Sequence, residues 1–238
     1  MALGAALTLG MAQADTLSKV KASGAVTMGV RESSGALSYT LGSGKYVGYH
    51  VEVCERVIQA VQKQLGLAAL AIRYQPVTSQ NRITLVRNGT VDIECGSTTH
   101  NAARQKDVSF AVTTYVEEVR MATKAPSGIT GMAQLRGKRV TTTTGTTSVQ
   151  TLRRYKRASG MNFDEVYGKD HADSFLLLES GRVDAFVMDG QILAGLISKS
   201  KNPAGFKIVG EALSVEPIAI MFRKDDPAFK KVVDATII

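Results

Sequence analysis

Hydroxyl and arginine side chains recur at the expected ends of strands and starts of helices. Arg31 ends the first expected strand, and Ser79 and Arg82 stand at the start of a short helix. The same combination returns at Ser97, Thr99 and Arg104, and hydroxyls alone return at a further helix start, at Thr146, Thr147 and Ser148. Helix N-termini favour anions, and a guanidinium matches a carboxylate through two hydrogen bonds. These residues therefore predict a site for a small anion.

Two titratable residues complete the candidate set. His171 lies in a polar turn, residues 169–173, and Asp189 ends the strand expected over residues 183–188. Three arginines around one pocket would repel each other unless an anion or acidic groups balanced them, and we expect Asp189 to be their lone acidic partner. Plainer interpretations stay open: Ser79 and Thr147 cap helices, residues 147–150 fit a capping box, and His171 is a solvated loop residue.

The elements that must position these residues follow from the apolar pattern. We expect strands at residues 25–30, 71–74 and 91–95. Apolar residues at helical spacing predict a helix from Val51 to Leu65 that stops at Gly66. Ser79 starts a short helix that closes at Asn88-Gly89. Alternating strands and helices predict an α/β fold with parallel sheets and helices on both faces.

The sequence contains an internal echo. Residues 83–93 resemble residues 176–186, since each segment is an apolar helix, a glycine stop, a Val-Asp pair and a strand. Two similar lobes would explain the echo, although helix–glycine–strand is common enough for chance to produce it. Extended segments at 113–121 and 217–222 are expected to cross between the lobes. We therefore expect lobe 1 over residues 15–115 with 219–238 returning to it, lobe 2 over residues 116–218, and a ligand cleft between them.

Composition excludes several classes of function. Lys plus Arg number 29 against 21 Asp plus Glu, so the net charge is +8, but the basic residues are dispersed. We expect solvated helix faces and no nucleic-acid partner, because no basic stripe with interleaved aromatics occurs. The three histidines lie far apart, so we expect no metal site and no cofactor. No apolar run reaches the roughly 18 residues that span a membrane.

The N-terminus and the cysteines bear on the compartment. Residues 1–14 are apolar, uncharged and end in Ala12-Gln13-Ala14, which predicts the remnant of a signal peptide without its basic start. A frayed terminus or a buried first helix is the alternative. Export would place the protein in the periplasm, where Cys54 and Cys95 can form a disulfide. Two separate buried thiols remain the other interpretation.

Five blocks in one order carry a family resemblance: Thr78-Ser79-Gln80-Asn81-Arg82, residues 94–99 followed by Arg104, Gly145-Thr146-Thr147-Ser148, Lys169-Asp170-His171, and residues 181–185 leading to Asp189. Together they resemble the glutamate/aspartate-binding proteins of bacterial ABC importers, within the polar amino-acid solute-binding family. The resemblance extends from about Leu17 to the end of the chain. It implies a type II periplasmic binding fold, two Rossmann-like α/β lobes joined by two hinge strands with the ligand cleft between them.

The resemblance also implies roles for individual residues. Arg104, with Ser97 and Thr99, would hold the α-carboxylate of L-glutamate or L-aspartate, and Thr147 would add a donor. Asp189 would pair with the α-ammonium group. The side-chain carboxylate would be surrounded by Arg31, Ser79, Arg82 and His171. The protein would act as a monomer, without catalysis, and deliver its ligand to the permease of an ABC transporter.

Two alternatives accompany this interpretation. Periplasmic cyclohexadienyl dehydratases resemble these binding proteins and would need a general acid such as His171 or Asp189. The sensory ectodomain of a membrane receptor is the other.

The family continues past the last helix of this chain, so we expect a C-terminus that is truncated relative to the family.

Overall fold

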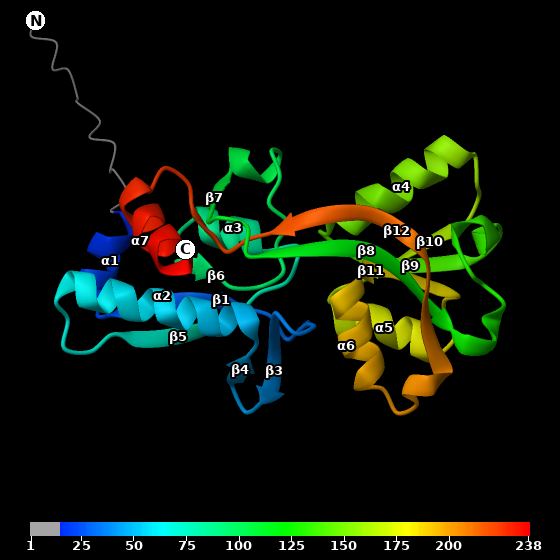
Figure 1. Ribbon diagram of the computed structural model, residues 1–238, viewed down its shortest axis with the longest axis horizontal. Coiled ribbons are helices and arrows are strands. Elements are labelled where there is room, and N and C mark those ends of the chain that lie inside the picture. Colours follow the sequence, from blue (N-terminus) through cyan, green and yellow to red (C-terminus); the bar gives the residue numbers. More distant parts are fainter. Residues whose placement is uncertain (1–14) are drawn as a thin grey trace, which may run out of the picture.

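The computed structural model describes residues 15–238 and places them in two lobes (Figure 1). We use lobe 1 for the elements around one five-stranded sheet, of order β5-β1-β6-β13-β7, and lobe 2 for those around a second, of order β10-β9-β11-β8-β12. A three-stranded sheet, β2-β3-β4, is attached to lobe 1. The predicted α/β class is therefore confirmed. Within residues 15–238, none of the helices has the length and apolar character needed to cross a bilayer.

Lobe 1 is built from both ends of the described chain. Its elements are α1 (Thr16–Ser23), β1 (Ala25–Val30), β2 (Ser33–Ser34), β3 (Ser38–Gly42), β4 (Lys45–Val47), α2 (Tyr49–Leu65), β5 (Ala71–Pro76), α3 (Arg82–Arg87), β6 (Ile93–Glu94), β7 (Val108–Phe110), β13 (Met221–Arg223) and α7 (Pro227–Ile237). Strands β5, β1 and β6 are parallel, as predicted, whereas β13 runs antiparallel to β6 and β7. Figure 1 shows α1, α2 and α7 gathered on one side.

Helix α2 shows why the apolar pattern predicts this lobe well. Val51, Cys54, Val57 and Val61 are buried in the core that lies between the sheet and α1, α2 and α7. Gly66 then ends the helix in the left-handed region, with φ 65°, a conformation that glycine adopts without steric cost. The predicted helix and its stop are confirmed.

Lobe 2 holds the middle of the chain. Its elements are β8 (Tyr115–Lys124), β9 (Arg139–Thr143), α4 (Thr147–Ser159), β10 (Asp164–Gly168), α5 (His171–Glu179), β11 (Ala185–Asp189), α6 (Gly190–Ser198) and β12 (Phe206–Ile218). Strands β10, β9 and β11 are parallel, and β8 is antiparallel to β11. Two separate apolar clusters form around this sheet, one with α4 residues and one with α5 and α6 residues. The sheet is thus covered by helices on both faces.

Strands β8 and β12 run side by side from lobe 2 back toward lobe 1 (Figure 1). They are antiparallel, and Ile218 at the end of β12 faces Tyr115 at the start of β8. Only the first two residues of the second predicted crossing, 217–222, belong to β12, and residues 221–222 belong to β13 in lobe 1. The predicted boundaries at 115/116 and 218/219 fall at the start of β8 and the end of β12, and the domain assignment itself stays a prediction.

The two lobes share one local design. In lobe 1, Asp92 follows α3 and its Oδ2 accepts a hydrogen bond from the N–H of Thr27 at 2.8 Å. In lobe 2, Asp184 follows α5 and its Oδ2 accepts from the N–H of Arg139 at 2.8 Å. In each case the aspartate joins the strand that follows the helix to the neighbouring parallel strand. The sequence similarity between residues 83–93 and 176–186 therefore corresponds to a local structure that occurs in both lobes.

A disulfide joins Cys54 on α2 to Cys95 just after β6. It ties the helix to the strand whose carboxyl end precedes the predicted residues Ser97 and Thr99. Residues 1–14, where we predict the signal peptide, lie outside the described residues.

Candidate ligand-binding site

A small polar cavity lies between the lobes. Lobe 1 lines it with side chains from the β5–α3 turn and from the segment after β6, and lobe 2 lines it from the carboxyl ends of β9 and β11 and from α5. Of the nine predicted ligand-binding residues, seven line this cavity: Ser79, Arg82, Ser97, Thr99, Thr147, His171 and Asp189. Thr146 and Met188 complete the lining. Arg31 and Arg104 do not line it.

Of the three predicted arginines, Arg82 is the one that lines the cavity. Its side chain is 2% exposed, and its Nε and Nη1 atoms have no hydrogen-bond partner. Burial lowers its pKa to about 9, and the charge of Arg104 adds to this, while Glu94 opposes it. A buried guanidinium with two open donors is costly unless an acceptor reaches it. Arg82 therefore presents a strong anion-binding group.

Ser79 lies beside Arg82 but does not cap its helix. Helix α3 begins at Arg82 with Asn81 as the preceding residue, whereas the hydroxyl of Ser79 is buried without a hydrogen-bond partner. The helix-cap interpretation of Ser79 is therefore wrong, because the chain makes a further turn before α3 starts. The hydroxyl is left free to donate into the cavity.

His171 is the first residue of α5 and is 1% exposed. The interpretation of His171 as a solvated loop residue is therefore wrong. Its Nδ1 lies 2.9 Å from the hydroxyl of Thr143, and its Nε2 has no partner. Burial lowers its pKa to about 3, and the nearby charge of Arg31 adds to this. A neutral imidazole thus offers Nε2 to the cavity.

Arg31 is paired across the lobes and lies outside the lining. It is fully buried, and its Nη2 contacts Oδ1 of Asp170 at 2.6 Å. Ser33 donates to the other oxygen of Asp170. Burial raises the pKa of Asp170, but the charge of Arg31 and the hydrogen bonds from Ser33 and Arg31 oppose this, and the pKa is lowered to about 2. Arg31 therefore holds the lobes together, while its Nε and Nη1 remain without partners.

Arg104 lies beside the cavity, where it holds the backbone. Its Nη1 donates to the carbonyl of Thr99 at 2.8 Å, and its Nη2 to the carbonyl of Gly145 in the other lobe at 3.4 Å. Burial lowers its pKa, and Glu216 opposes this most strongly. Each Nη carries two N–H groups, so both atoms retain a donor for a further acceptor.

Asp189 is the acidic group of the cavity, but it is not the lone acidic residue that we predicted. It ends β11, as expected, and is 5% exposed. Burial raises its pKa to about 8, and Glu117 and Glu216 add to this. Glu94 is also buried nearby, with its Oε1 unpartnered, and the half-buried Asp170 pairs with Arg31. The arginines are thus balanced by several carboxylates, which the prediction of one partner did not foresee.

Thr147 begins α4, and its neighbour Thr146 occupies the cap position. The hydroxyl of Thr146 donates to the carbonyl of Thr143 at 2.7 Å, so the capping box proposed over residues 147–150 is not formed. The first N–H groups of a helix have no intrahelical acceptor. Thr147 therefore brings both a free backbone donor and a hydroxyl to the cavity.

Contacts between the lobes close the site. Besides Arg31 and Asp170, the N–H of Ala36 donates to the side chain of Gln191 at 2.9 Å. Gly145 lies against the backbone of Ser79, where a Cβ atom would come within 2.7 Å of the Ser79 carbonyl oxygen. The structure therefore shows the two lobes in a closed arrangement.

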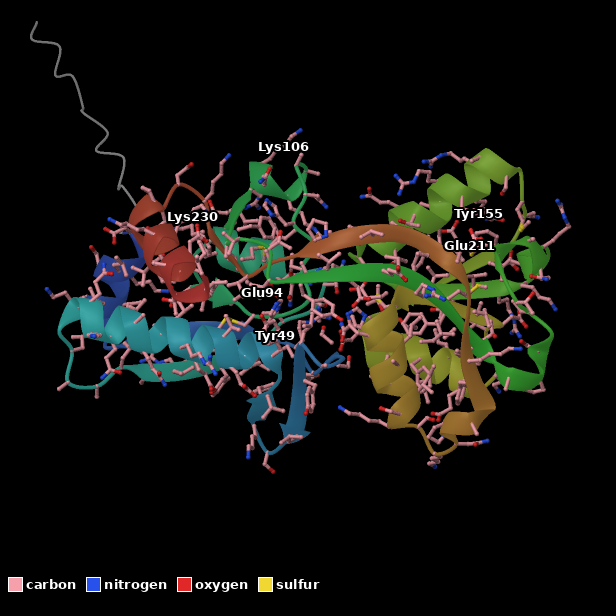
Figure 2. All side chains as sticks on the ribbon, in the orientation of Figure 1. Tyr49, Glu94, Lys106, Tyr155, Glu211 and Lys230 are labelled. Atoms are coloured by element: carbon pink, nitrogen blue, oxygen red, sulfur yellow. A yellow bond between two sulfur atoms is a disulfide. The ribbon has the colours of Figure 1, made fainter. Side chains whose placement is uncertain are left out.

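The carboxylates that balance the arginines are what sequence reasoning missed. Asp170 had a signal, since it stands next to His171 in a block that we singled out. Glu94 lies within the expected strand at 91–95 and ends β6, and Figure 2 shows it where lobe 1 meets the hinge strands. No sequence signal pointed to Glu216, because its position depends on how β12 pairs with β8. In residues 15–238, no three His, Cys, Asp or Glu side chains are placed to hold a metal ion.

Two α/β lobes that close through two long strands over a buried polar cavity define a solute-binding protein. The comparisons agree: the chain belongs to the bacterial extracellular solute-binding proteins, family 3, whose sequence model matches residues 26–238. The resemblance predicted from the five sequence blocks is confirmed.

Similar proteins refine this assignment. The chain is 44% identical to the glutamate/aspartate import solute-binding protein of Escherichia coli K12, over 99% of this chain and 80% of that protein. It is 46% identical to the L-glutamate/L-aspartate-binding protein of Pseudomonas aeruginosa, over 93% of this chain and 74% of that protein. These relatives are solute-binding proteins, so the dehydratase alternative is not favoured.

Solved structures support the fold. An ABC transporter periplasmic binding protein from Brucella ovis, solved with glutathione bound, superposes with a TM-score of 0.83 at 27% identity, over 94% of this chain and 70% of that one. The predicted fold class, a type II periplasmic binding fold, is confirmed by this match together with the family assignment.

Proposed function

We propose that this protein captures L-glutamate or L-aspartate between its lobes and delivers it to the permease of an ABC importer. Two similar proteins are named for glutamate/aspartate import and for L-glutamate/L-aspartate binding, and the cavity supplies the matching chemistry. One observation carries the proposal. The unpartnered donors of Ser79 and Arg82, and Nε2 of His171, meet the carboxyl of Asp189 around one small cavity. Such a site fits a ligand that carries an anionic group to accept from these donors and a cationic group to pair with Asp189.

The ligand's side-chain carboxylate is assigned to Arg82, Ser79 and His171. Arg82 supplies charge and the open N–H groups of Nε and Nη1, and Ser79 supplies a hydroxyl. Nε2 of His171 joins them in the tautomer that protonates this nitrogen. Arg31 lies close enough for its charge to act on both His171 and Arg82. A glutamine amide would place an NH₂ group against cationic donors and leave them poorly paired.

The α-carbon groups are assigned to the other residues. The α-carboxylate meets the remaining donors of Arg104 and the free N–H at the start of α4, at Thr147. The α-ammonium pairs with Asp189 in a charge-assisted contact. Ser97, whose hydroxyl donates to that of Ser34 at 3.1 Å, contributes an oxygen on the lobe 1 side.

Closure follows from where these groups come from. Arg82 and Ser79 belong to lobe 1, whereas His171, Thr147 and Asp189 belong to lobe 2. A ligand that contacts both sets binds the closed form better than the open form and shifts the population toward it. A micromolar dissociation constant corresponds to about 8 kcal/mol, which a few desolvated charge-assisted bonds supply after entropy losses.

The setting of this function is the periplasm. Residues 1–14 would direct export and be removed, and the permease would recognise the closed form of the monomeric protein. Cys54 and Cys95 form the kind of disulfide that an oxidising compartment permits.

Calorimetric titration tests the proposal. L-glutamate, L-aspartate, L-glutamine and succinate are titrated separately into the purified protein. We expect tight binding of one or both acidic amino acids, and binding of glutamine and succinate that is weaker by at least about a hundredfold, since each lacks one charged group. Glutamine bound as tightly as glutamate would contradict the assignment of Arg82.

A further inference from the structure

Glu216 is a buried carboxylate that lies just outside the cavity. It stands near the end of the hinge strand β12 and is 7% exposed. Its Oε2 accepts a hydrogen bond from the hydroxyl of Thr99 at 2.6 Å and another from the hydroxyl of Thr147 at 2.7 Å. Thr99 belongs to lobe 1 and Thr147 to lobe 2, and both line the cavity. One carboxylate oxygen therefore accepts a hydrogen bond from a hydroxyl of each lobe.

These two bonds decide what the hydroxyls offer to a ligand. A threonine hydroxyl has one hydrogen and two lone pairs, so it can donate or accept. With both hydrogens directed to Glu216, the oxygens of Thr99 and Thr147 face a ligand as acceptors only. The two oxygens are 3.5 Å apart, so they serve the same part of the cavity. The hydroxyls of Thr99 and Thr147 are thus unavailable as the carboxylate donors that we predicted. For Thr147, only the N–H remains for that role.

Acceptors at this place favour one kind of ligand group. Asp189, which lines the same cavity, is a third acceptor. An ammonium group has three N–H donors and no acceptor, so it can satisfy all three oxygens at once. A carboxylate or a bare methylene at the same position satisfies none of them and leaves buried polar atoms unpaired.

We propose that Glu216 is a positioning residue that fixes the hydroxyls of Thr99 and Thr147 as acceptors and so makes the site select α-amino diacids over diacids without the amino group. This inference rests on the proposed function and names a determinant of its selectivity. Without Glu216, both hydroxyls rotate freely and can donate to an acid, so the preference for an amino group weakens.

The test compares two ligands that differ only in the amino group, L-glutamate and glutarate. Calorimetry, with competition for weak binding, gives the ratio of the glutarate to the glutamate dissociation constant. We expect Glu216→Ala to lower this ratio by about tenfold or more. Glu216→Gln keeps an oxygen that accepts both hydroxyls but loses the charge, so its ratio falls by about threefold.

Glu118→Gln is the matched control. Glu118 lies on the other hinge strand, is half exposed and pairs with Arg120 at 3.2 Å. The substitution Glu118→Gln removes the same charge from the hinge without altering a contact of either threonine, so the ratio should not change. Thermal unfolding of each variant shows that it is folded, and the nearly isosteric Glu216→Gln still tests the inference if Glu216→Ala does not fold.

The possible results are distinct. Equal weakening of both ligands in the Glu216 variants, or no change in either, would overturn the inference, because a merely structural role does not alter the ratio. Failure of the wild-type protein to bind glutamate would overturn the proposed function, and this inference with it.

Discussion

At the scale of single residues, the position of Asp189 makes binding depend on pH. Its carboxyl is buried near Glu117 and Glu216, and its pKa is raised to about 8. An α-ammonium beside it favours the ionised form and lowers that pKa, so binding releases a proton at neutral pH. The affinity for glutamate should therefore rise between about pH 6 and pH 8 and level off above.

Calorimetry in buffers of different ionisation enthalpy measures this proton release. In Asp189→Asn, which cannot titrate, glutamate binds more weakly and the rise with pH disappears. An affinity that stays constant or falls between pH 6 and 8 in the wild-type protein would show that Asp189 does not meet the ammonium group.

The two arginines near the cavity should have separable effects. Arg104→Ala removes the donors assigned to the α-carboxylate, which every amino acid has, so binding of glutamate, aspartate and glutamine should all be lost. Arg82→Ala removes the donors assigned to the side-chain carboxylate, so glutamate should weaken by about a hundredfold while glutamine changes little. Titration of both variants with the same ligands decides this, and unchanged glutamate affinity in Arg104→Ala would refute its assignment.

At the scale of elements, the loop between β9 and α4 controls closure. Gly145 has φ 80°, and a Cβ there would lie 2.7 Å from backbone atoms of Ser79 and Gln80 in lobe 1. Backbone atoms of the facing lobe can give way only if the lobes separate. Gly145→Ala should therefore reduce glutamate affinity by at least about tenfold.

Gly160, which ends α4, offers a matched control. Its φ is 62°, so alanine there carries a similar backbone strain, but nothing lies within 4 Å of the added Cβ. Both variants should lose stability by about 1 kcal/mol, while only Gly145→Ala loses affinity. Equal glutamate affinity in the two variants would mean that Gly145 does not limit closure.

The elements also show how far the sequence could predict the site. Side chains at the carboxyl ends of parallel strands converge in any such sheet, which is why Ser97, Thr99 and Asp189 could be found from the strand pattern. Helix starts were less certain, since polar spacing alone misplaced the start of α3 and left Ser79 as a cap. Glu216 could not be predicted because it reaches Thr99 and Thr147 only through the register of β12 with β8.

At the scale of the whole molecule, the charge balance explains why three arginines can share one interior. Glu94 and Glu216 are buried with them, and the half-buried Asp170 pairs with Arg31, so a ligand anion is not needed to neutralise every cation. Composition could predict that balancing groups exist, but not which of the 21 acidic residues supply them. Lys106 and Lys230, two of the other basic residues, project from different elements of lobe 1 (Figure 2).

The most direct test of the account is a crystal structure of the protein grown with L-glutamate. The account predicts one glutamate in the interlobe cavity, its side-chain carboxylate on Arg82 and Ser79, and its ammonium between Asp189 and the hydroxyls of Thr99 and Thr147. Glutamate bound elsewhere, or bound in the cavity with its ammonium toward Arg82, would contradict it.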